Sequence, residues 1–282
     1  MSVDTGKAAG EQVAIPSGAE GTEAAASARV RIQKGFRWNA CDAYLFDIDG
    51  TLMRAQGGVH YDAFSSSVLA IMGFPVSLEG VSVHGGTDTG ILRDAFRNSA
   101  IADEVWQPRL EEILEQMRAT VTNRRTEMRL VVLPGVVQIL SYLKNMGKLL
   151  GLATGNLEQI GWLKVEQAGL REWFTFGGFS DRHVARSELV GHALKQARLL
   201  AGQEATVCVV GDTPADIAAA KANSLPAIAV ATGIYSYDKL LEHSPEVCAS
   251  TFKALLEDGD SPCSHGERQG ESPNIKPNGY GT

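Results

Sequence analysis

The sequence predicts an α/β fold, a doubly wound, mostly parallel, Rossmann-like sheet with a second, α-helical cap domain inserted after the first strand. Short apolar runs alternate with helical patterns between residues 36 and 256. Each run is continuously apolar rather than alternating, as in parallel strands that are buried on both faces. About a hundred residues separate the first run from the second, far more than a crossover connection needs, which predicts the insert.

Five of these apolar runs are expected to be strands, and they lie at residues 43–47, 149–153, 174–179, 206–210 and 227–231. Helix signals stand between them. Pro134 is expected at the first position of one helix, and Asn156 is expected to cap another that Gly169 ends.

Within the insert, three segments favour helices. Apolar residues at positions 110, 113, 114, 117 and 121 follow helical spacing, and residues 61–72 and 89–99 resemble two more amphipathic helices. The predicted domain organisation is therefore a core of residues 36–52 and 131–256 and a cap of residues 53–130. The ends, residues 1–35 and 257–282, are rich in small and polar residues and are expected to be disordered tails.

Composition limits the partners. The 282-residue chain has 26 Lys and Arg against 33 Asp and Glu, a formal net charge of −7, which argues against nucleic acid or an anionic membrane as a partner. Its four cysteines form no metal-binding pattern, and no stretch approaches the length of a membrane span. A reduced, cytoplasmic setting is expected, and the oligomeric state is left open.

Polar residues follow three of the expected strands. They are DIDGT after the first strand, TGN (154–156) after the second and GDTPAD (211–216) after the fourth. In open α/β sheets, ligands bind beyond the carboxyl ends of the strands, so these segments are expected to meet. Together they offer four acids, a hydroxyl and several backbone N–H groups, which predicts a site for a cation and an oxyanion.

Each segment taken alone has a purely structural explanation. Asp-Gly is a common turn pair, Asn156 could be only a helix cap, and Thr213, Pro214 and Asp216 fit a capping box. Other phosphate and metal motifs are excluded. An EF-hand loop counted from Asp47 needs Gly where Leu52 stands, and neither a P-loop nor a dinucleotide fingerprint is present.

Two motifs carry a resemblance to a known family. D-x-D-G-T-L at residues 47–52 and G-D-x-x-x-D at residues 211–216 resemble the haloacid dehalogenase superfamily, in particular its phosphoglycolate phosphatase-like members with a helical cap. The resemblance implies a phosphatase that hydrolyses a small phosphorylated metabolite through an aspartyl-phosphate. It implies Asp47 as nucleophile, Asp49 as general acid and base, Thr154 as phosphate ligand, and Asp212 with Asp216 as Mg²⁺ ligands.

Elementary electrostatics requires the same groups. A carboxylate approaching a phosphate faces a repulsion of about 4 kcal/mol at about 4 Å and an effective dielectric constant of about 20. Mg²⁺ relieves it and prefers oxygen ligands, for which Asp47 and a carbonyl near Asp49 are expected to join the two later acids. Asp49 should give and take a proton, so its pKa is expected to be raised by neighbouring negative charge.

Substrate-binding groups are expected beside these acids. The expected set is Gly50, Thr51, Gly155, Asn156 and, as the best candidate from the cap, Arg54. One departure from the family pattern stands out. Members usually carry a Lys before the last motif, but no Lys lies between Lys164 and Lys195. Arg186 is expected to replace it, with Arg182 as second choice.

Other reactions of the superfamily can be sorted. Asp49 argues against a dehalogenase, which does not need that acid. A phosphonatase uses a cap lysine, and residues 35–143 contain none. A phosphomutase uses the same acids and differs in how the cap excludes water, so it stays open. A non-catalytic phosphate-binding or partner-binding module on the same fold is the remaining alternative.

Overall fold

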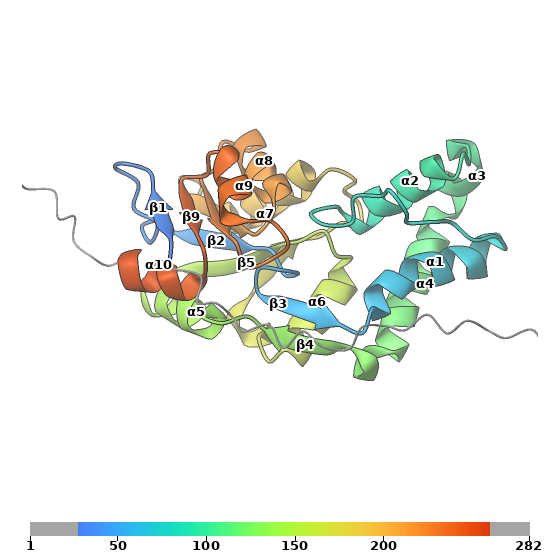
Figure 1. Ribbon diagram of the computed structural model, residues 1–282, viewed down its shortest axis with the longest axis horizontal. Helices are drawn as coiled ribbons and strands as arrows, with labels where there is room; N and C mark the ends of the chain where they lie inside the picture. The colour runs from blue at the N-terminus through green and yellow to red at the C-terminus, as the bar shows by residue number, and fades with distance from the viewer. Residues whose placement is uncertain (1–27, 260–282) are drawn as a thin grey trace, which may run out of the picture.

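The computed structural model of the protein describes residues 28–259, which form two lobes joined by a narrow ribbon (Figure 1). One lobe is a sheet covered by helices, and the other is a bundle of helices. The predicted α/β class with a mostly parallel sheet is confirmed. Among residues 28–259, no helix is both long and apolar enough to cross a bilayer.

The central sheet has seven strands in the order β1-β9-β8-β7-β2-β5-β6. All neighbours pair in parallel except β1 and β9 at one edge. In chain order the strands are β1 (Val30–Ile32), β2 (Ala43–Phe46), β5 (Leu149–Ala153), β6 (Phe176–Gly178), β7 (Val207–Gly211), β8 (Ala227–Val230) and β9 (Val247–Ala249). The first strand in the sequence prediction, β2, therefore lies between β5 and β7, at the centre.

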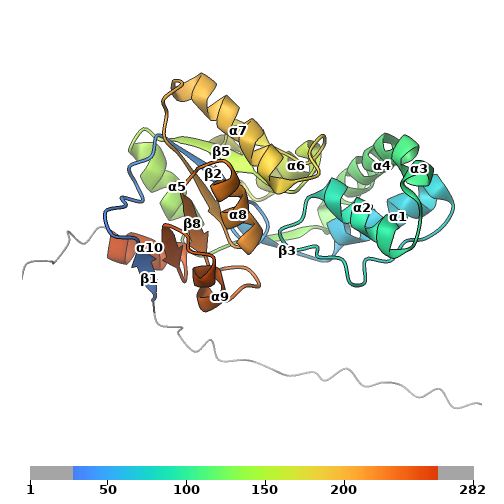
Figure 2. The same cartoon turned by 90° about the horizontal axis from the view of Figure 1, so that it is seen from above.

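Helices cover both faces of the sheet, and each face has its own apolar core (Figure 2). On one face lie α5 (Val136–Asn145), α6 (Glu158–Gln167), a short 3₁₀ turn (Arg171–Trp173) and α10 (Phe252–Gly259). The other face carries α7 (Arg186–Ala201), α8 (Pro214–Ala222) and α9 (Tyr237–Glu242). Because both faces are covered, β2 is fully buried, which explains its continuously apolar sequence.

The second lobe, residues 57–128, is called the cap below. It contains α1 (Val59–Met72), α2 (Asp88–Asn98), α3 (Asp103–Trp106), α4 (Leu110–Asn123) and two 3₁₀ turns (Gln107–Arg109, Arg125–Glu127). An antiparallel ribbon of β3 (Met53–Gln56) and β4 (Arg129–Val132) joins it to the core. The expected long helix is α4, whose buried residues Ile113, Leu114, Met117 and Val121 pack within the cap.

Several expectations about the elements were wrong. The predicted N-terminal tail of residues 1–35 includes β1, and the predicted C-terminal tail begins inside α10. The rest of both predicted tails, residues 1–27 and 260–282, lies outside the described residues. The ribbon of β3 and β4 was not predicted. The structure starts α5 after Gly135, so Pro134 is not its first residue.

Candidate active site

Three strand ends bring the candidate residues together. Asp47 follows β2, Thr154 follows β5 and Asp212 follows β7, and these three strands are neighbours in the sheet. All three run parallel, so their carboxyl ends meet at one edge, which is the edge facing the cap (Figure 2). A cavity of 560 Å³ lies there, and Asp47, Asp49 and Thr154 are among the residues that line it.

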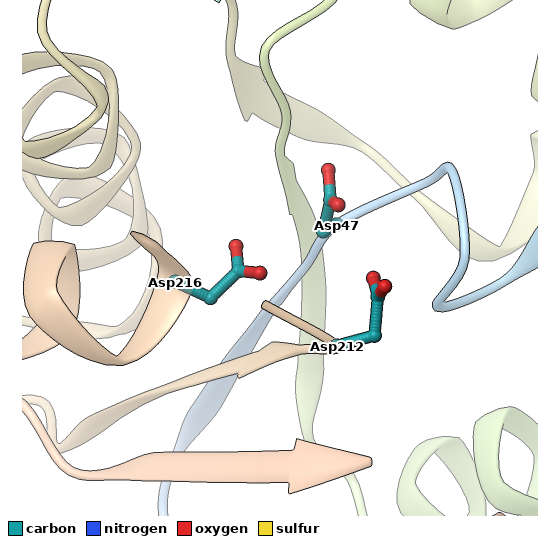
Figure 3. Close-up of side chains that lie close together, drawn as sticks. All are labelled: Asp47, Asp212 and Asp216. Carbon is teal, nitrogen blue, oxygen red and sulfur yellow. The ribbon is translucent and has the colours of Figure 1, made fainter. Parts of the chain in front are cut away.

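Asp47, Asp212 and Asp216 form a group of buried carboxylates that we call the acid cluster. Figure 3 shows the three side chains lying close together. One carboxylate oxygen from each lies within 4.8 Å of those of the others. Asp47 is 5% exposed and Asp212 is 3% exposed, so water screens their mutual repulsion poorly.

This repulsion shows in the proton affinities of two members. Burial, and then the charges of Asp47 and Asp216, raise the pKa of Asp212 to about 8. The pKa of Asp47 is raised to about 6, mainly by burial, although Arg186 acts in the opposite direction. The cluster is therefore short of positive charge, which is the electrostatic property of a cation site.

Arg186 supplies the one cation that contacts the acid cluster among the described residues. Its Nη2 lies 2.8 Å from Asp47 Oδ1 and 2.7 Å from Asp216 Oδ1, and its Nε donates to Asp216 Oδ1 at 2.8 Å. The guanidinium is also tied to the cap, because Nη1 donates to the Gly85 carbonyl at 3.2 Å. Arg182 is exposed, so the geometry favours the first of the two expected arginines.

Asp216 occupies the third position of α8 and closes the expected capping box. Its Oδ2 accepts from the backbone N–H of Thr213 at 3.0 Å and from the Thr213 hydroxyl at 2.7 Å. Since Oδ1 faces Arg186, both oxygens of this carboxylate already have protein partners. Asp212 differs, because within residues 28–259 only its Oδ1 has a hydrogen-bond donor, the hydroxyl of Thr51 at 2.8 Å.

Thr51 and Gly50 both lie against the carboxylate of Asp212. Thr51 is fully buried and donates to Asp212 instead of facing the cavity, so the structure does not support its predicted contact with substrate. Gly50 lines the cavity with a φ of +88°, and a Cβ there would lie 2.4 Å from Asp212 Oδ2. Only glycine allows the chain to pass this close to the carboxylate.

Asp49 lies in a different environment from Asp47. Its Oδ2 accepts from Lys164 Nζ at 2.6 Å and from Asn156 Nδ2 at 2.9 Å. Burial raises the pKa of Asp49, but the ammonium of Lys164 and the amide of Asn156 lower it by more, so it lies below its ordinary value. The expectation of a raised pKa was wrong, because the side chain faces a cation and not the acid cluster.

Asn156 was expected to cap α6, and that expectation was also wrong. The helix begins after Leu157, and the Asn156 amide instead donates to Thr154 Oγ1 at 2.6 Å while its Oδ1 accepts from Lys164 at 2.7 Å. Thr154, Gly155 and Asn156 all line the cavity. A Cβ on Gly155 would lie 2.0 Å from the backbone oxygen of Gly86 in the cap. The backbones of this loop and of the cap are therefore in contact, and a larger residue than glycine would not fit between them.

Arg54, on β3, also lines the cavity. Its side chain is exposed, and its Nη2 donates to the Thr232 carbonyl at 2.6 Å. The cavity wall on the cap side is largely apolar and contains Val59, Phe64, Val83, Ile91 and Met128. Arg54 therefore brings a positive charge to the lining of the cavity.

The sequence analysis missed Lys164 as a site residue. It is 2% exposed and lies on the buried side of α6 with Ile160 and, one turn before, Leu157. A signal was present, because positions 157, 160 and 164 follow helical spacing and a lysine on an apolar stripe requires a charged partner. Neither the motifs nor the distance along the chain identified Asp49 as that partner.

Comparison with known proteins identifies the family of the chain. Residues 41–223 match the family model of haloacid dehalogenase-like hydrolases. The protein named probable phosphatase IndB from Dickeya dadantii is 28% identical over 236 residues, which cover 78% of this chain and 97% of that protein. A phosphoglycolate phosphatase from Agrobacterium fabrum is 25% identical, covering 75% of this chain and 89% of that one.

Among solved structures, a predicted phosphatase from Clostridium acetobutylicum matches with a TM-score of 0.55 and 21% identity. The match covers 73% of this chain and 92% of that one, and at this identity it shows the fold alone. From the family model, the chain belongs to the haloacid dehalogenase-like hydrolases. Its phosphatase relatives identify it further as a phosphoric monoester hydrolase.

Proposed function

We propose that the protein is a Mg²⁺-dependent phosphatase that hydrolyses a small phosphorylated metabolite through an aspartyl-phosphate on Asp47. The observation that carries the proposal is the acid cluster with Arg186, of which Asp47, Asp212 and Arg186 line a cavity beside the cap. A buried carboxylate that contacts a guanidinium and opens to a ligand-sized cavity has the surroundings that a nucleophile toward phosphate requires.

The acid cluster fits a divalent cation by its charge and by its donors. When all three carboxylates are ionised, the cluster carries three negative charges against the single positive charge of Arg186, and the excess matches one Mg²⁺. Carboxylate oxygens are the hard ligands that Mg²⁺ prefers. We propose that Asp47, Asp212 and the backbone carbonyl of Asp49 hold the ion, with Asp216 nearby, and that the bound ion supplies charge neutralisation at the phosphate.

In the first step, a carboxylate oxygen of Asp47 attacks the phosphorus atom and the ester P–O bond breaks. Protonated Asp49 donates its proton to the departing alkoxide, which leaves as an alcohol. Arg186 offsets the negative charge that gathers around Asp47, while Thr154 and the N–H groups of Gly50 and Gly155 bind the other phosphate oxygens.

In the second step, Asp49 acts as a base. It takes a proton from a water molecule, whose oxygen attacks the phosphorus atom, and the bond between phosphorus and Asp47 breaks. Inorganic phosphate is released, and both carboxyl groups return to their starting forms. The lowered pKa of Asp49 suits this second step, since an ionised Asp49 is ready to accept a proton.

The substrate class follows from the cavity and the relatives. Arg54 places a cation where a carboxylate or hydroxyl of a small phosphorylated acid or sugar would lie. The relative from Agrobacterium fabrum is named phosphoglycolate phosphatase, which makes 2-phosphoglycolate the first compound to test.

The test is release of inorganic phosphate from a panel of phosphorylated metabolites by the pure protein, with Mg²⁺ and with EDTA. We expect turnover that requires Mg²⁺ and that Asp47→Asn removes. Trapping of ³²P on the wild-type chain but not on Asp47→Asn would support the intermediate. Transfer of the label to a second organic molecule, without release of phosphate, would instead indicate a phosphomutase and contradict the proposal.

A further inference from the structure

Lys164 is a buried cation that the proposed steps above do not use. Its side chain is 2% exposed, and its ammonium contacts Asp49 Oδ2 at 2.6 Å, Asn156 Oδ1 at 2.7 Å and His60 Nδ1 at 3.1 Å. These three partners match the three N–H groups of an ammonium. Burial of a charged lysine destabilises the folded chain unless hydrogen-bond and ion-pair partners offset the lost hydration. The three partners of Lys164 provide that offset.

The partners of Lys164 come from both lobes. Asp49 follows β2 and Asn156 follows β5 in the core, whereas His60 lies at the start of α1 in the cap. The His60 ring stacks on Phe64, with ring centroids 5.4 Å apart. Its other nitrogen, Nε2, lies 3.0 Å from Asp88 Oδ2, so both ring nitrogens are engaged.

Asp88 joins the cap to the same core loop. Its Oδ2 accepts from the backbone N–H of Leu157 at 2.8 Å, and its own N–H donates to the Gly155 carbonyl at 2.7 Å. Asp88 is 3% exposed. A continuous chain of polar contacts therefore runs from the core loop through Asp88 and His60 in the cap to Lys164 and Asp49.

We propose that Lys164 is a positioning residue for Asp49, and that His60, oriented by Asp88, completes the ammonium's contacts when the cap lies on the core. This inference rests on the proposed function, in which Asp49 exchanges a proton with the leaving group and with water. Lys164 holds one oxygen, Oδ2, so that the other oxygen of Asp49 faces the cavity. The cap thereby takes part in aligning the acid and base, besides covering the substrate.

The leaving group provides a direct test. An alkyl ester needs the proton of Asp49 to depart, whereas p-nitrophenolate departs without one. We expect Lys164→Met, which keeps the length and apolar stem of the side chain, to lower kcat/KM for 2-phosphoglycolate and glycerol 2-phosphate by about 100-fold. The same variant should lower kcat/KM for p-nitrophenyl phosphate by less than about 5-fold, because that reaction does not need the positioned acid.

A matched control is Arg118→Met. Arg118 also links cap and core through a partly buried ion pair, 2.9 Å from Asp181, but it does not touch Asp49. If the variant only weakens the contact between cap and core, it should lower kcat/KM for both kinds of ester by a similar factor. In the Asp49→Asn background, Lys164→Met should produce no further selective loss, since the group that it positions is already absent.

Equal loss of activity toward both kinds of ester in Lys164→Met, or unchanged activity toward both, would overturn the inference. If Lys164→Met shows no cooperative melting, His60→Phe keeps the stacked ring, removes the contact with Lys164, and should shift the same ratio in the same direction by about 3- to 10-fold. A ratio unchanged in that variant also overturns it. Failure of the wild type to hydrolyse any ester would instead contradict the proposed function itself.

Discussion

Asp47 and Asp49 are two residues apart, yet they lie in opposite electrostatic surroundings. Asp47 is buried beside Arg186 and two other acids, and burial above all raises its pKa to about 6, whereas Lys164 and Asn156 hold the pKa of Asp49 below its ordinary value. The proposed chemistry requires the reverse at the start, an ionised nucleophile and a protonated acid. The difference supports the proposals that a cation joins the acid cluster and that Asp49 acts as a base in the second step.

The acid cluster and the surroundings of Asp49 also differ in which lobe of the molecule supplies their residues. The three carboxylates of the acid cluster all belong to the core, and their link to the cap runs through Arg186, whose Nη1 donates to the Gly85 carbonyl. The surroundings of Asp49 include His60 and Asp88 of the cap, since His60 contacts both Lys164 and Asp88. Changes in the acid cluster should therefore remove activity toward every substrate, whereas changes around Asp49 should depend on the leaving group.

The largest effect is expected from Asp47→Asn. An amide oxygen is a poor nucleophile, so we expect kcat for p-nitrophenyl phosphate to fall by about 10⁴-fold or more, measured by release of p-nitrophenolate. The fold should survive, because the amide can still accept from Arg186. Activity within about tenfold of wild type, in protein with the same melting temperature, would refute a covalent role for Asp47.

Removal of divalent cations comes next. With EDTA we expect activity to fall by about 10³-fold and to return with added Mg²⁺, because the excess negative charge of the acid cluster repels phosphate. Asp212→Asn should raise the Mg²⁺ concentration needed for half-maximal activity by about 10- to 100-fold. Full activity after exhaustive chelation would mean that the acid cluster serves another purpose.

Substitution of Arg186 tests charge neutralisation near Asp47 while leaving the proposed nucleophile in place. We expect Arg186→Met to lower kcat/KM by about 10²- to 10³-fold, since the guanidinium that stabilises charge near Asp47 is lost. The neighbouring Arg182→Met is the matched control, and it should change kcat/KM by less than about twofold because that side chain is exposed. Comparable losses in the two variants would show that Arg186 has no special role.

The smallest effect concerns stability. Asp212 and Asp47 bind protons more tightly in the folded chain, with pKa values of about 8 and about 6. Their contribution to stability is present below the ordinary pKa near 4 and is lost as the pH rises through 6 and 8. We expect the melting temperature of the metal-free protein to fall by about 5 °C between pH 5 and pH 8.

Mg²⁺ should offset this fall, because it binds the ionised carboxylates and stabilises the protein more at pH 8 than at pH 5. The control is Asp212→Asn, which cannot titrate at that position. In this variant both the melting temperature and its increase with Mg²⁺ should depend less on pH. An equal response of wild type and Asp212→Asn would assign the pH dependence to groups outside the acid cluster.

Much of the fold and part of the candidate site could be predicted from the sequence. Continuously apolar runs predicted five of the seven strands of the central sheet, and two motifs with Thr154 identified residues that the structure brings to one sheet edge. The edge strand β1 and its neighbour β9, each of three residues, were missed, because such short strands leave little pattern in a sequence. The ribbon of β3 and β4 was missed for the same reason.

Asn156 and Asp49 show where local interpretation fails. Asn156 after a strand fits a helix cap, but its amide is drawn to Asp49, Thr154 and Lys164, three residues that no local pattern brings together. The pKa of Asp49 was expected to follow the acids near it in sequence. Side chains two positions apart after a strand can face different surroundings, and here Asp49 faces a lysine 115 residues further along the chain.

By itself, the sequence determined which groups can do chemistry and which strand each one follows, because apolar periodicity and short motifs are local properties. The tertiary structure alone decided between Arg186 and Arg182 as the cation of the acid cluster, and it alone showed that Lys164 faces Asp49 and that His60 of the cap contacts Lys164. The physical reason is that charge pairing acts through space and is strengthened by burial, and neither distance nor burial between remote segments is encoded in any short stretch of residues.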